Sequence, residues 1–139
     1  MTNTYKDYFN SQEQLKTASS LLNSKDYESA AAYLKRARES AKQVFNEPVL
    51  AANAVQSYTT SSILLIATYI RRHQQMPAYE FQQDSTKQLT QWLNNTNSKS
   101  LADLCHYCHQ LLITGCQHSR CLGHCLQQLE EHGYAQEQT

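Results

Sequence analysis

Apolar residues recur three and four positions apart along most of this chain, a spacing typical of amphipathic helices. The clearest case follows Asp26, whose carboxylate is suited to accept hydrogen bonds from the free amides of a first helical turn. The pattern predicts a helix from Asp26 to about Phe45. Its expected buried face consists of Tyr27, Ala30, Leu34, Ala37, Ala41 and Val44. The alanines on this face are small enough for a neighbouring helix to approach closely.

The same period predicts about six helices, which cover roughly residues 4–23, 26–45, 48–73, 78–94, 100–115 and 119–133. The breaks between them are short, so consecutive helices should form three antiparallel hairpins. The third helix has the widest apolar stripe and is expected at the centre of the core. We therefore expect a single all-α domain over residues 1–139.

Particular residues are expected at the helix ends and faces. Met76-Pro77 should close the third helix, Ser100 and Asp103 should form a capping box, and Gly115 should stop the fifth helix. Cys116 then falls in a loop. The apolar stripe of the first helix is expected to include Tyr5 and Phe9.

The hairpin over residues 15–45 resembles one tetratricopeptide unit. The resemblance is carried by Ala18, Leu21, Asp26-Tyr27, Ala30, Leu34 and Ala37. Lys25 stands where the family usually has a turn Gly, and no later hairpin repeats the pattern well. The resemblance implies an array of helical hairpins whose groove holds a peptide or a partner helix. Two architectures stay open: a tetratricopeptide-like array and a compact helical bundle.

Charge and composition argue against several classes of protein. The chain has 12 Lys and Arg against 12 Asp and Glu, and this balance argues against non-specific nucleic-acid binding. The N-terminus lacks the features of a secretory signal, and the longest apolar run, Ile63 to Ala67, is too short to span a bilayer. We expect a cytoplasmic protein with reduced thiols.

A Cys- and His-rich stretch occupies the C-terminal hairpin, over residues 100–133. Two interpretations of it stay open. In the first, the cysteines lie on apolar helix faces as small buried thiols and no cofactor is bound. In the second, the hairpin binds zinc or copper, since the Cys spacing is compatible with a metal site and the region faintly resembles the Cys-rich helical bundles that store copper. The metal ligands would come from Cys105, Cys108, Cys121, Cys125, His109 and His124.

Basic residues Lys35, Arg38 and Lys42 follow one side of the second helix and are a candidate surface for a partner. Catalytic motifs are missing from the sequence: it has no nucleophile elbow and no Gly-rich phosphate loop, and nothing orients a Cys116–His118 pair. The sequence therefore predicts a non-catalytic protein-interaction module, an adaptor or scaffold. The alternative is a metal-binding or redox-responsive bundle. Self-association of the chain is left open.

Overall fold

The computed structural model describes the backbone of residues 4–117 and the side chains of residues 4–114. Within this part the chain forms five α-helices and one 3-10 turn, and 89% of it is helical with no strand. The all-α prediction is confirmed. The elements are α1 (Thr4–Asn23), α2 (Tyr27–Val44), η1 (Pro48–Leu50), α3 (Ala51–Arg71), α4 (Gln75–Asn95) and α5 (Lys99–Gln117). The sixth predicted helix, from Ser119 to Gly133, lies outside the described residues.

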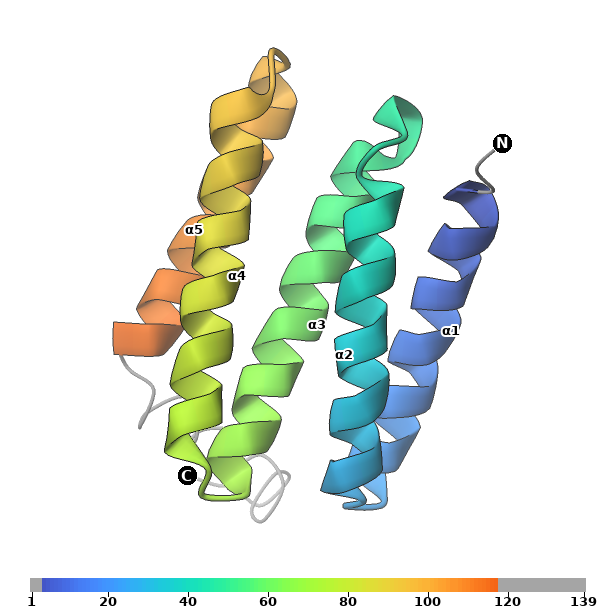
Figure 1. The fold of residues 1–139 in the computed structure, drawn as a ribbon, viewed down its shortest axis with the longest axis vertical. Helices are drawn as coiled ribbons and strands as arrows, with labels where there is room; N and C mark the ends of the chain where they lie inside the picture. The colour runs from blue at the N-terminus through green and yellow to red at the C-terminus, as the bar shows by residue number, and fades with distance from the viewer. Residues whose placement is uncertain (1–3, 118–139) are drawn as a thin grey trace, which may run out of the picture.

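Successive helices run in opposite directions and pack side by side, with α2 and α4 nearer the viewer and α3 and α5 behind them (Figure 1). The α1–α2 pair has the most extensive contact, and α3 touches α1, α2, α4 and α5. The prediction that this helix forms the centre of the core is confirmed. Tyr58 and Leu65 of α3 are fully buried there, beside Leu34 of α2 and Leu89 of α4.

Two of the hairpin turns share one geometry. After α1, the amide of Asp26 donates to the Leu21 carbonyl at 2.8 Å, and Lys25 has a positive φ of 62°. After α3, the amide of Gln74 donates to the Tyr69 carbonyl at 2.8 Å, and His73 has φ 60°. Both are Schellman-type helix ends, in which a left-handed residue lets the chain reverse at once. Each non-glycine residue there carries a steric cost, which the turn imposes.

Helix ends are set by local capping, and several of them differ from the sequence prediction. Asp26 caps α2 as predicted, its Oδ1 accepting from the Ser29 amide at 3.3 Å. Met76-Pro77 does not close α3 but lies in the first turn of α4. Proline is tolerated there because an amide in the first turn has no intrahelical acceptor.

The start and end of α5 also differ from the prediction. Ser98 Oγ accepts from the Leu101 amide at 3.2 Å, so Ser98 caps the helix in place of the predicted Ser100–Asp103 box. Asp103 pairs with Lys99 instead, at 3.5 Å. The helix continues through Gly115 to Gln117, so the predicted stop at Gly115 is wrong. A single glycine costs a helix only about 1 kcal/mol.

The outer face of α1 is more exposed than its apolar residues suggest. Tyr5 is 54% exposed and Phe9 70% exposed, so their predicted place on a buried stripe is wrong. Ala18 is the one fully buried apolar residue of this helix. As an end helix of the described part, α1 has a neighbour on one side, and apolar residues on its other side stay in solvent.

Among the described residues, one helix, Pro48–Arg71, is long and apolar enough to cross a membrane. It is also the central helix, with 61% of its most apolar stretch buried inside the protein. The core helix of a bundle meets the same criterion, so this is weak evidence for a membrane span.

Candidate functional site

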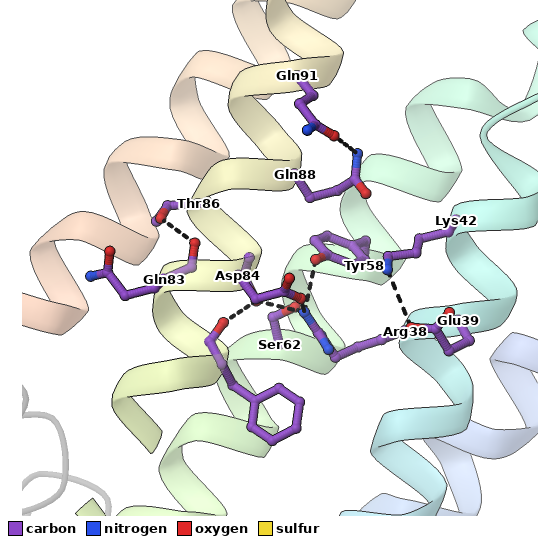
Figure 2. Close-up of polar contacts among 12 residues, drawn as sticks. Arg38, Glu39, Lys42, Tyr58, Ser62, Gln83, Asp84, Thr86, Gln88 and Gln91 are labelled. Atoms are coloured by element: carbon purple, nitrogen blue, oxygen red, sulfur yellow. Dashed lines mark hydrogen bonds and ion pairs between the residues drawn. The ribbon is translucent and has the colours of Figure 1, made fainter. Parts of the chain in front are cut away.

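A buried arginine joins the three inner helices of the described part. Arg38 projects from α2 with 3% of its side chain exposed. Its Nε donates to Ser62 Oγ at 2.8 Å, and its Nη2 lies 2.8 Å from Tyr58 Oη (Figure 2). The same Nη2 lies 2.9 Å from both Asp84 Oδ2 and Ser85 Oγ of α4. We call these five residues the Arg38 network.

The charges and hydrogen bonds of this network hold a buried guanidinium between three helices, which is a structural role. The Arg38 guanidinium also lies over the rings of Tyr58 and Phe81, at 4.9 and 5.1 Å from their centroids. Asp84 reaches solvent, with 57% of its side chain exposed, while the guanidinium does not. Burial raises the pKa of Tyr58, and the positive charge of Arg38 partly opposes this. A buried charge is tolerated only where hydrogen bonds replace water, and this network supplies them.

The three basic residues predicted as a partner surface do not share one environment. Lys35 is exposed, its ammonium 5.6 Å from the Tyr69 ring centroid. Lys42 is half-buried and pairs with Glu39 at 3.3 Å. Arg38 is turned inward, so its place in a solvated basic row is wrong. The sequence does indicate that Arg38 is buried, because Arg38 follows Leu34 by four positions and therefore shares the buried face of Leu34.

Cys105 and Cys108 of α5 are buried, as the core interpretation predicts for these two residues. Cys105 is 0% exposed and Cys108 4% exposed, and both are free thiols. Burial raises the pKa of Cys105 to about 11, and the neighbouring Cys108 adds to the shift. Burial also raises the pKa of Cys108, which a hydrogen bond with Thr59 partly opposes. Both thiols are therefore protonated at neutral pH and are poor nucleophiles.

The metal hypothesis rests largely on residues that the structure does not describe. His109 is half-buried on α5, whereas Cys121, His124 and Cys125 lie outside the described residues. Within the described part, no three His, Cys, Asp or Glu side chains are grouped so that they could hold a metal ion. Cys116 lies in α5, so the prediction that places it in a loop is wrong. The metal site stays a prediction.

An apolar groove opens where the end of α3 meets the start of α4. It has a volume of about 440 Å³ and is lined by Ile66, Ile70, Gln75, Met76, Ala78, Tyr79 and Gln82. We call it the α3–α4 groove. Its floor includes Ile66 and Ala78, which are 6% and 4% exposed, and its rim carries Met76 and Tyr79, which are 67% and 56% exposed. Methionine adapts to irregular apolar ligands, and tyrosine contributes a large contact area at low entropic cost.

The tight turn at His73 produces this groove. It reverses the chain in so few residues that α4 starts beside the last turn of α3, and Pro77 is absorbed into the first turn of α4. Met76 and Tyr79, three residues apart, then lie on one face of α4. The sequence does not predict this groove, because Met76-Pro77 has the pattern of a break between helices, and a residue in a break belongs to no helix face.

A second hollow lies at the opposite end of the helices, where Pro48 and Val49 approach Ser98, Ser100 and Leu101. Its volume is about 390 Å³. Val49 is 72% exposed beside it. This hollow offers a matched position for substitutions that should leave the α3–α4 groove intact.

Comparisons with protein-family models, with curated proteins and with solved structures found no match. The fold and the geometry of these sites therefore carry the functional argument.

Proposed function

We propose that this chain is a non-catalytic protein-interaction module that holds the apolar side of a peptide or partner helix in the α3–α4 groove. The observation that carries the proposal is the pairing of a buried aliphatic floor, Ile66 and Ala78, with an exposed rim of Met76 and Tyr79. Concave apolar sites with a few polar groups are the usual form of binding sites. An amphipathic helix fits such a site with side chains spaced i, i+3, i+4 and i+7.

The proposal includes the finer architecture expected from the sequence: three hairpins in a tetratricopeptide-like array, in the cytoplasm. Two features of the structure support the array. Four of the residues that carry the resemblance, Ala18, Ala30, Leu34 and Ala37, are fully buried. The α1–α2 and α3–α4 turns repeat one geometry. An array of hairpins buries its core between neighbours and leaves surfaces free for a partner.

The non-catalytic part of the proposal rests on how the reactive groups are held. Tyr58 lies in the Arg38 network, and Cys105 and Cys108 are buried with raised pKa values. Catalytic groups need access to a substrate and a pKa suited to their task. The groove itself is lined by aliphatic, aromatic and amide side chains. These supply binding and shape more readily than proton transfer.

The test uses a fluorescent peptide of roughly 18 residues, five helical turns, with Leu at i, i+3, i+4 and i+7 in a polar background. Fluorescence anisotropy measures its binding to the full chain. We expect saturable binding that weakens at least about tenfold, roughly 1.4 kcal/mol, in Tyr79→Glu. Val49→Glu at the opposite end is the control and should bind like the unchanged chain.

A scrambled peptide of the same composition distinguishes specific binding in the groove from non-specific hydrophobic binding. Equal binding of the patterned and scrambled peptides would contradict the proposal. So would equal affinity for the Tyr79→Glu and Val49→Glu variants.

A further inference from the structure

The last described helix, α5, contacts a residue that lines the α3–α4 groove. Gln82 of the groove donates through Nε2 to the Leu112 carbonyl of α5 at 3.5 Å. From Leu112 the helix continues only to Gln117, five residues or roughly 7.5 Å along its axis. Because α5 runs antiparallel to α4, this last stretch heads toward the end of α4 at which the groove lies. The sequence has 22 more residues, 118–139, after this helix.

The sequence of these residues suits an apolar groove. Leu122, Cys125, Leu126 and Leu129 are spaced i, i+3, i+4 and i+7, which places them on one face if the segment is helical. Between them stand Gly123, His124, Gln127 and Gln128. From Leu122 to Leu129 such a helix extends roughly 10.5 Å, about two turns. That length matches a groove whose α4 side runs from Gln75 to Gln82, also seven positions.

We propose that residues 119–133 dock in the α3–α4 groove of the same molecule and compete there with a partner. The proposal rests on the function proposed above, since it names the regulation of that site. A tethered segment acts at an effective concentration of the order of millimolar, so modest affinity is enough to fill the groove. The apparent affinity for a partner is then the intrinsic affinity multiplied by the fraction of molecules whose groove is open.

Amide hydrogen exchange of the full chain, read by mass spectrometry over residues 119–133, tests the docking. In the unchanged chain we expect these amides to exchange at least about tenfold more slowly than in Leu126→Glu, whose charge cannot enter the groove. Tyr79→Glu changes the groove side of the same contact and should remove the protection to the same extent. Met76→Glu serves as a second groove variant, and Val49→Glu as the control that keeps the protection.

Several outcomes would overturn the docking proposal. One is equal exchange in the unchanged chain and in Leu126→Glu. Another is protection that survives both Tyr79→Glu and Met76→Glu, because the segment would then pack elsewhere. A third is protection that grows with protein concentration, because the groove would then be filled by a second copy.

The patterned peptide of the previous section separates this proposal from the proposed function. If the segment closes the groove, Leu126→Glu should bind the peptide about tenfold more tightly than the unchanged chain. Equal affinities for these two chains would overturn the competition while leaving the interaction function standing. If the peptide does not bind Leu126→Glu at all, the interaction function fails, although the exchange result can still uphold docking in cis.

Discussion

At the scale of single residues, Arg38 is the side chain whose environment differs most from its sequence expectation. A guanidinium that is 3% exposed must replace its lost hydration with protein acceptors. It does so with three hydroxyls and one carboxylate, drawn from α3 and α4. Its planar fork suits this task, because several donors point outward in fixed directions. The network therefore fixes the register of α2 against α3 and α4.

Replacing Asp84 by Asn tests the electrostatic part of the network. The variant keeps the shape of the side chain but leaves a buried cation without its counter-charge, so we expect a loss of about 1–3 kcal/mol. Solvent around Asp84 limits the loss, since the carboxylate is 57% exposed. Urea unfolding measures it. Glu39→Gln, which breaks the partly exposed Glu39–Lys42 pair, should cost less than about 0.5 kcal/mol. Equal costs for the two variants would contradict this account.

Cys105 predicts a pH dependence of stability. Its pKa is about 11 in the folded protein and about 8.5 in an unfolded chain, so the folded state holds the proton more tightly. The stabilisation is complete below about pH 8.5 and is lost as the pH rises towards 11. The slope from this group is at most about 1.4 kcal/mol per pH unit. Urea unfolding of the unchanged chain and of Cys105→Ala between pH 7 and 10 should show a shallower decline in the variant. Parallel declines would rule out this contribution.

At the scale of helices, the α1–α2 pair depends on small side chains. Ala18, Ala30 and Ala37 are all 0% exposed, so the prediction that Ala30 and Ala37 are buried is confirmed. The two helices make the most extensive contact in the described part, with alanines on both sides of it. Dispersion contacts between closely spaced backbones then take the place of large interlocking side chains.

Ala30→Leu tests this close packing. A larger side chain at a fully buried position forces the helices apart and should cost about 1–3 kcal/mol, measured as a lower thermal midpoint. Ala32→Leu is the matched control, because Ala32 lies on the exposed face of the same helix. It should change stability by less than about 0.5 kcal/mol. An unchanged midpoint in Ala30→Leu would remove the close-packing argument and the tetratricopeptide resemblance with it.

At the scale of the whole molecule, the helical period predicted the all-α class and the position of each described helix to within a few residues. Burial of an apolar face is a local property of the sequence, and Leu34 or Tyr58 shows it directly. The sequence does not predict the Arg38 network, because a charged side chain usually faces solvent and the partners that allow Arg38 to be buried come from two other helices. The sequence alone does not predict the α3–α4 groove, because the groove depends on the turn at His73 and on side chains from two different helices. These are features of tertiary structure, and the apolar pattern of a single helix does not predict them.

The packing of each helix mainly against its neighbours along the chain has a consequence for the kinetics of folding. Apart from weaker contacts, the helices touch those adjacent or next-but-one in sequence. Contacts of this kind close short loops, so little chain entropy is lost before the first favourable contacts form. Folding should therefore be fast, in the range of about microseconds to milliseconds typical of helical domains. Either the α1–α2 or the α3–α4 hairpin can nucleate it, and the other can then add to the structured end.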